Sequence, residues 1–262
     1  MVEVIEFAWH VPMEGLACRD RKPDSEGAGE PVRLLSWPVL EPYFRNPYRP
    51  LEEHPTLFRI LADVEPTEEG CLEFAGQYGS LGRGPTMPSL ASDLTVFQVE
   101  GSEHWYAGET LARWKRDIEW MSLAVRVCDA WQAKNRSRLL SVLKEAYPLA
   151  QCATYEDAAK EPFRAARLLL HHVFSDFLPR VGLSVDRKLR RVIQPASLRD
   201  ALWLQFQSSI EEGRVFARCE YCRSWFWIPP QTAGRKRFCR DSCRVGASKR
   251  RSRKQRNRRR SA

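Results

Sequence analysis

Cys219-Glu220-Tyr221-Cys222, followed after sixteen residues by Cys239-Arg240-Asp241-Ser242-Cys243, is the stretch that decides how the C-terminal part of this chain folds. A spacer of two or three residues lets two thiolates turn toward one ion, and two such pairs match a tetrahedral four-cysteine Zn2+ site. We therefore predict one structural Zn2+ ion, bound by Cys219, Cys222, Cys239 and Cys243. Because all four ligands are cysteine, the site is expected to be closed, with no metal catalysis.

Aromatic residues follow the first cysteine pair. The pair is expected at a tight turn between two short strands, and alternation along the second strand puts Trp225 and Trp227 on one face and Phe226 and Ile228 on the other. In so small a unit, these aromatic side chains and the metal would have to supply the core. The alternative use of the tryptophans is a platform on which nucleobases stack, which requires exposed rings.

The order of elements predicts a treble-clef zinc finger over residues 213–247. After a turn at Ala233-Gly234, residues 235–238 are expected to return as a second strand. Cys239 and Cys243 lie four residues apart, so they are expected on one face of the helix that follows.

The segments 218–227 (RCEYCRSWFW), 236–244 (KRFCRDSCR) and 249–251 (KRR) carry a family resemblance. Residues 214–262 resemble the C-terminal zinc finger of the bacterial CGNR zinc-finger proteins, although Arg244-Val245-Gly246 stands where that family has Gly-Asn-Arg. The resemblance implies that the finger binds DNA in transcriptional control and that a larger N-terminal domain senses a ligand or stress.

Charge is divided unequally along the chain, whose net charge is +9. Residues 214–262 hold seventeen basic and two acidic residues, a balance of +15, whereas residues 1–213 hold 25 basic and 31 acidic residues, a balance of −6. A four-cysteine zinc site carries −2, which leaves the C-terminal part strongly basic. A polyanion is the expected partner of that part, with DNA favoured over RNA. The predicted nucleic-acid contacts are Arg235, Lys236, Arg237, Arg240, Arg244, Lys249, Arg250, Arg251, Arg253, Lys254 and Arg256.

The basic tail, residues 248–262, is expected to be helical or disordered, since like charges repel one another along it. Against a nucleic acid it could extend the helix that begins near Cys239, and the zinc ion would then aim the charge. Neutralising roughly 5 to 8 phosphates gives a slope of log K against log salt of about −5 to −7.

The fold class expected is mainly α with minor β. We predict a mostly helical body over residues 1–212, irregular or extended over 1–52 and helical over 53–212, then the finger over 213–247 and the tail. The clearest helix is expected at 109–134, where apolar residues recur at intervals of three and four. Further helices are expected after an N-cap at Thr67, at 136–147, from Pro162, and after a capping box formed by Ser197 and Asp200.

Short extended segments are also expected. Candidate strands lie at 2–9, 32–37 and 95–99, a turn at 101–108, and a hairpin between 181 and 193.

The four remaining cysteines, Cys18, Cys71, Cys128 and Cys152, lie far apart and are expected to be ordinary semi-buried thiols. The N-terminal residues carry acids where a signal peptide carries positive charge. A soluble, cytoplasmic protein is expected, nucleoid-associated if it binds DNA. A homodimer and a small-molecule ligand of the N-terminal domain remain open.

Signatures of hydrolases, metalloproteases and zinc deaminases are absent from the sequence, so an enzyme is the least expected class. A DNA-binding transcriptional regulator is the favoured function. The alternatives are an RNA-binding or ribosome-associated protein, and a protein-interaction module such as a toxin–antitoxin component.

Overall fold

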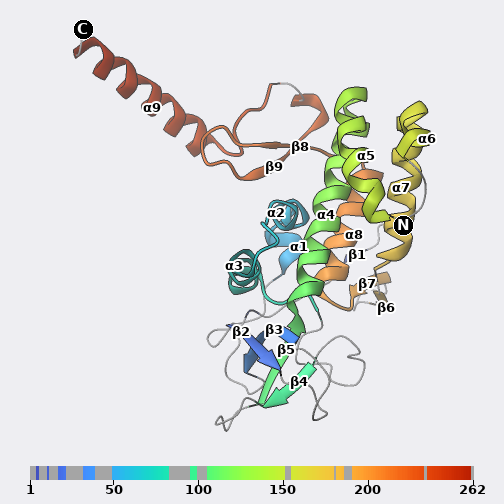
Figure 1. Cartoon of the computed structure of the whole chain (residues 1–262). Helices are drawn as coiled ribbons and strands as arrows, with labels where there is room; N and C mark the ends of the chain where they lie inside the picture. Colours follow the sequence, from blue (N-terminus) through green and yellow to red (C-terminus); the bar gives the residue numbers. More distant parts are fainter. Residues whose placement is uncertain are drawn as a thin grey trace. The chain divides into compact units, whose positions relative to one another are not determined.

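The computed structural model describes residues 4–5, 11, 17–21, 32–38, 49–82, 95–98, 105–150, 155–179, 181–185, 191–232 and 235–260. Helices dominate this part of the chain and the strands are few and short, which confirms a mainly α fold with minor β (Figure 1). The chain divides into two compact units, Met1–Leu204 and Gln205–Ala262. None of the helices within the described ranges is long and apolar enough to cross a membrane.

Helices and strands are each numbered in their order along the chain. The helices are α1 (Pro50–Glu53), α2 (Leu57–Ala62), α3 (Glu68–Tyr78), α4 (Leu111–Gln132), α5 (Arg136–Ala150), α6 (Tyr155–Lys160), α7 (Pro162–Asp176), α8 (Leu198–Glu211) and α9 (Asp241–Arg260). The strands are β1 (Val4–Ile5), β2 (Ala17–Arg21), β3 (Val32–Pro38), β4 (Thr95–Gln98), β5 (Trp105–Thr110), β6 (Val181–Val185), β7 (Arg191–Pro195), β8 (Val215–Arg218) and β9 (Trp225–Ile228).

Helix α4 is the centre of the first unit, and α2, α3, α5 and α7 all contact it. The apolar spacing that predicted this helix is confirmed, because the side chains on that line are buried. These residues are Leu111, Trp114, Ile118, Met121, Val125 and Cys128.

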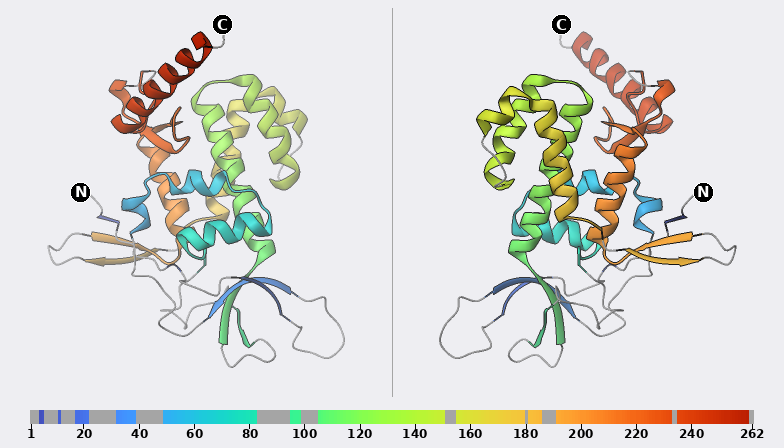
Figure 2. Two further views of the ribbon diagram at one scale, coloured as in Figure 1. Left: turned by 90° about the vertical axis from the view of Figure 1, so that its left-hand side faces the viewer. Right: turned by 90° about the vertical axis from the view of Figure 1, so that its right-hand side faces the viewer.

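Two small sheets accompany the helices of this unit. Strands β2, β3, β5 and β4 form an antiparallel sheet in that order, which lies at the N-terminal end of α4 (Figure 2). Strands β6 and β7 form the predicted hairpin, and β1 pairs with β7 in parallel. The strands expected at 32–37 and 95–99 are therefore present as β3 and β4.

Strand β5 corrects two predictions. The expected turn at 101–108 is a strand from Trp105 onward, and the helix expected from residue 109 begins at Leu111. Glu109 consequently lies within the strand, one residue before its end, and is buried, where its Oε2 accepts a hydrogen bond of 2.8 Å from Trp114 Nε1. Burial raises the pKa of this carboxyl to about 7.

The predicted caps of two helices are confirmed. Thr67 Oγ1 accepts a hydrogen bond from the Gly70 N–H at 3.1 Å. Ser197 Oγ accepts from the Asp200 N–H at 3.0 Å and donates to Asp200 Oδ2 at 2.6 Å. Both side chains satisfy backbone donors that a helix leaves unpaired at its first turn.

Three cysteines outside the C-terminal cluster lie in the described part of the chain, and all three are free thiols. Cys71 and Cys128 are buried and Cys18 is half-buried, while Cys152 lies outside the described residues. Burial raises the pKa of Cys71 to about 11 and that of Cys128 to about 12. Such thiols stay protonated and unreactive at neutral pH.

An ion pair that the sequence pattern did not indicate joins α2 to α4. The Arg59 guanidinium, buried within the unit, donates to both carboxylate oxygens of Asp129 at 3.0 and 2.7 Å. Removing one partner of a pair in such surroundings leaves the other charge poorly solvated.

We expect Arg59→Met to lower the free energy of unfolding of this unit by about 3 kcal/mol. The exposed pair of Arg126 and Glu145, whose atoms lie 2.7 Å apart, offers a matched control. Arg126→Met should cost less than about 1 kcal/mol. Urea unfolding followed by circular dichroism measures both values, and equal costs for the two variants would contradict a structural role of the buried pair.

Candidate metal centre

The first cysteine pair lies in the turn of a β-hairpin, as predicted. Strands β8 and β9 pair antiparallel, with Arg218 opposite Trp225 at the turn. The turn closes through a hydrogen bond of 2.9 Å from the Cys219 N–H to the Ser224 carbonyl and another of 2.9 Å from the Arg223 N–H to the Cys219 carbonyl. Arg223 has a positive φ of 65°, as tight turns of this kind require.

The second cysteine pair lies at the start of α9. Cys243 is in the first turn of this helix, whereas Cys239 lies two residues before the helix begins. The Arg240 carbonyl accepts hydrogen bonds from the N–H groups of Cys243 and Arg244, at 3.1 and 3.3 Å. The expectation that both cysteines lie on the helix therefore holds for Cys243 only, because Cys239 lies before the helix begins.

The prediction of a strand at 235–238 is wrong. The N–H groups of Arg235 and Lys236 donate to the Thr232 carbonyl at 3.0 and 3.2 Å, so this segment folds back on a 3-10 turn and forms no ladder. One backbone bond, from the Glu220 N–H to the Arg237 carbonyl at 3.1 Å, joins it to the first cysteine turn. The expected turn at 233–234 lies outside the described residues.

Four sulfur atoms meet where these segments converge. The Sγ atoms of Cys219, Cys222, Cys239 and Cys243 all lie within 4.8 Å of one another. Cys239 Sγ lies 3.6 Å from Cys222 Sγ and 3.5 Å from Cys243 Sγ. A metal with four bonds of about 2.3 Å to sulfur in a tetrahedron sets adjacent sulfurs about 3.8 Å apart. The four side chains therefore lie close enough to bind one metal ion.

Hydrogen bonds polarise this cluster. The Ser224 hydroxyl and N–H both donate to Cys222 and lower its pKa. Burial acts to raise the pKa of Cys219, but N–H groups of Cys222, Cys239 and Tyr221 outweigh it, and the net shift is downward. The pKa of Cys239 is raised, because it is partly desolvated and surrounded by the other sulfurs. Four sulfurs this close together disfavour a fully ionised cluster, and a bound cation would offset the repulsion among the thiolates.

One face of the hairpin packs against the cysteines. Phe226 and Ile228 are buried with Cys219 and Cys243, and the partly buried Ala217, Phe238 and Cys239 complete this small core. The expectation that aromatic side chains fill the core therefore holds for Phe226.

The opposite face of the hairpin corrects that expectation for the tryptophans. Trp225 is only half-buried, and Trp227 keeps 43% of its surface exposed. The Cζ atom of Arg218 lies 4.7 Å from the centroid of the Trp225 ring, and that of Arg214 lies 5.7 Å from the Trp227 ring. Sequence reasoning left both arginines out of the candidate contacts, although Arg214 and Arg218 share the parity that puts them on one side of β8.

Helix α9 approaches the first cysteine turn through a glycine. A Cβ atom on Gly246 would lie 2.6 Å from Cζ of the Tyr221 ring, so the ring packs directly on the helix at this position. A glycine inside a helix is unfavourable by itself, and this contact explains why it is present.

The predicted basic contacts differ in their surroundings. Arg237 forms a bidentate ion pair with Glu220, and Arg244 pairs with Asp241 at 3.1 Å. Lys236 Nζ lies 5.5 Å from the Phe226 ring centroid. Hydrogen bonding to Cys243 raises the pKa of Arg240. The side chains of Arg235, Lys249, Arg250, Arg251 and Arg253 are exposed, and Lys254 and Arg256 continue the backbone of α9.

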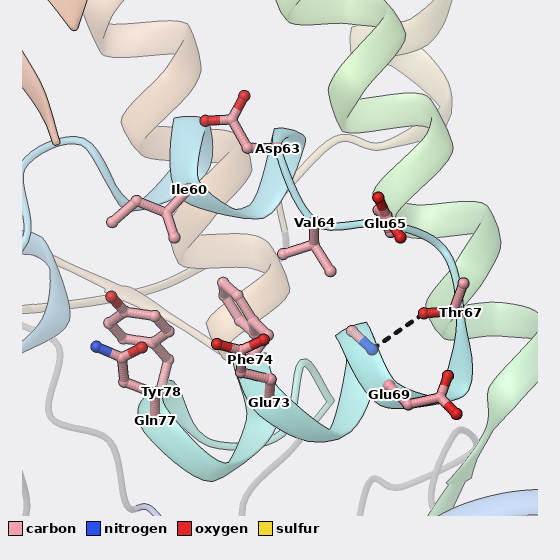
Figure 3. A pocket seen from close by; sticks show the side chains of 11 residues that line it. Ile60, Asp63, Val64, Glu65, Thr67, Glu69, Glu73, Phe74, Gln77 and Tyr78 are labelled. Carbon is pink, nitrogen blue, oxygen red and sulfur yellow. Dashed lines mark hydrogen bonds between the residues drawn. The ribbon is translucent and has the colours of Figure 1, made fainter. Parts of the chain in front are cut away.

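The body, residues 1–212, contains a pocket that is lined partly by acidic side chains. Its volume is about 420 Å³, and it lies between α2 and α3, where Phe74 and Tyr78 face it (Figure 3). Acidic side chains dominate the polar part of its lining, and the described residues that line it include no Lys or Arg. The acidic lining of this pocket contrasts with the excess of basic residues in the second unit. Its four carboxylates are those of Asp63, Glu65, Glu69 and Glu73.

Comparison with known proteins gives no relative: the chain matches no protein-family model, no curated protein and no solved structure.

Proposed function

We propose that this chain is a zinc-finger nucleic-acid-binding protein whose four clustered cysteines bind one structural Zn2+ ion. The observation that carries the proposal is the meeting of four sulfur atoms at the start of a helix rich in Lys and Arg. Thiolates favour Zn2+ over Mg2+ and Ca2+, which prefer oxygen ligands. The second unit holds seventeen basic and four acidic residues, a balance of +13, which favours a polyanionic partner.

Two parts of the expected treble-clef order support such a finger, although residues 235–238 do not form its second strand. A cysteine turn in a hairpin is followed by a helix that carries the last ligand in its first turn. Together with the sequence resemblance to CGNR zinc-finger proteins, this order favours a DNA-binding transcriptional regulator in the cytoplasm. The body over residues 1–212 would then serve as a sensing or oligomerisation domain.

In this proposal the role of the metal ion is to fix the position of α9 relative to the hairpin. Zn2+ would hold the first turn of α9 against the hairpin, so that the exposed side chains from Lys249 to Arg253 project from a helix whose origin is fixed. An α-helix fits the major groove of B-DNA, where Arg and Lys reach phosphates on both sides. Phosphate contacts place the protein on the duplex, and base contacts add sequence preference.

A second candidate function is supported by one observation. The exposed Trp227 and the arginine over its ring resemble surfaces that contact unpaired bases. This favours an RNA-binding or ribosome-associated protein as the alternative to a DNA-binding regulator.

The test of the proposed function uses the full chain loaded with zinc. We expect it to shift both duplex DNA and structured RNA in a gel at about 50 mM salt, and to weaken as salt rises. Crosslinking in cells followed by nucleic-acid sequencing then distinguishes DNA from RNA. The absence of any shift at low salt would contradict the proposal, and a protein complex that survives nuclease treatment would favour an interaction module.

A further inference from the structure

The exposed face of the β8–β9 hairpin carries alternating basic and aromatic side chains. The register places Phe216 opposite Trp227 and Arg218 opposite Trp225, and Arg214 precedes them on the same side of β8. Three aromatic and two basic side chains therefore share one face, which we call the Trp–Arg face (Arg214, Phe216, Arg218, Trp225 and Trp227).

The core of the finger does not require this face. The other side of the same strands supplies Phe226 and Ile228, which are buried against the cysteines. Single apolar side chains at a surface are common, whereas a cluster of them on one face marks a site of interaction, and here three aromatic side chains share one face of a short hairpin. Two tryptophans kept at the surface of a unit with few apolar residues therefore indicate a partner that contacts them.

The charge around the rings selects the class of partner. The guanidinium groups of Arg214 and Arg218 lie over the tryptophan rings, within reach of a cation–π contact. A partner that offers both negative groups for the arginines and flat rings for the tryptophans is a nucleic acid. Within a duplex the bases stack on one another and their faces are covered, so only unpaired bases can stack on the indoles.

We propose that the Trp–Arg face binds single-stranded nucleic acid by stacking unpaired bases on Trp225 and Trp227. This inference rests on the proposed function and names its substrate class, a nucleic acid with a segment of unpaired bases. The phosphate contacts proposed for α9 are separate from this contact. Neighbouring side chains on one face of a strand are about 6.8 Å apart, so each indole offers a separate surface for one base. Arg218 leaves the Trp225 ring, Arg214 leaves the Trp227 ring and its ion pair with Glu212, and both pair with the phosphates of the same nucleotides.

The test measures the affinity of the zinc-loaded full chain for oligo(dT), oligo(U) and a DNA duplex. Trp227→Ala should weaken binding to one or both single strands by about tenfold and the Trp225→Ala/Trp227→Ala double variant by about a hundredfold, with duplex binding changed less than about twofold. Trp227→Phe should keep most of the affinity, because a stacking ring remains. The zinc content of each variant reports whether the finger is intact.

The outcomes separate this inference from the proposed function. If the wild-type chain binds duplex and single strands but Trp227→Ala changes neither, the Trp–Arg face is not a base-stacking site, although the proposed function stands. Equal weakening of duplex and single strands, or a protein partner lost on Trp227→Ala, also overturns the inference. If the wild-type chain binds no nucleic acid, the proposed function fails as well. The two single strands show whether the natural partner is DNA or RNA.

Discussion

Cys219→Ser is expected to abolish metal binding and to unfold the chain from Val215 onward. Apparent zinc-binding free energies in such fingers are about 10–16 kcal/mol, and this binding is also folding free energy. The metal-free core offers two buried apolar side chains, Phe226 and Ile228, worth about 1.5–3 kcal/mol each. Ordering the chain costs about 1–2 kcal/mol per residue, so these contacts alone are insufficient.

Zinc content per chain and amide hydrogen exchange measure this effect. In Cys219→Ser, the amides of β8 and β9 should lose protection, whereas those of α4 should keep it. Cys128→Ser is the matched control, because Cys128 is equally buried but lies in the body. It should retain one zinc ion per chain. A Cys219→Ser chain that still held zinc and a protected hairpin would contradict a four-cysteine site.

Neutralising the exposed charges of α9 is expected to weaken duplex binding by about 10³-fold at 0.1 M salt. The variant replaces Lys249, Arg250, Arg251 and Arg253 with Gln, all of which are exposed. If each contacts one phosphate, the slope of log K against log salt should become shallower by about 3 to 4. Fluorescence titrations at several salt concentrations give both the affinity and the slope.

A control variant with the same change in net charge separates local contacts from overall charge. Exposed basic residues of the body can be replaced by Gln in equal number, namely Arg116, Arg138, Lys144 and Arg167. Affinity should fall by less than about threefold, because exposed charges beyond about 10 Å from the nucleic acid are screened at this salt. Equal losses in the two variants would show that α9 makes no specific contacts with phosphates.

Features governed by neighbouring residues could be predicted from the sequence. The apolar spacing along α4, the caps at Thr67 and Ser197, and the turn that holds Cys219 and Cys222 all depend on residues within a few positions. The cysteine spacing likewise places two pairs of thiols, and the fold brings the pairs together.

Features that depend on residues far apart in the sequence could not be predicted in this way. Arg59 and Asp129 are 70 positions apart, and nothing local marks either as part of a buried pair. Glu109 satisfies a helical pattern, yet pairing with Leu35 draws it into β5. Nonlocal strand pairing of this kind overrides local propensity.

In the candidate site, too, local patterns could be predicted from the sequence and the exposure of side chains could not. Alternation predicted which side chains share a face of β9, but exposure depends on what covers each face. The cysteine cluster fills one side, which leaves Trp227 outside. The contact of Tyr221 with Gly246 joins segments that only the fold brings together.

The most direct measurement of the central claim is X-ray absorption at the zinc edge of the purified full chain. Four cysteine ligands predict a single shell of four sulfur atoms at about 2.3 Å, with no nitrogen or oxygen ligand. A shell that mixes sulfur with oxygen or nitrogen at about 2.0–2.2 Å, or a chain that binds no zinc, would contradict the account.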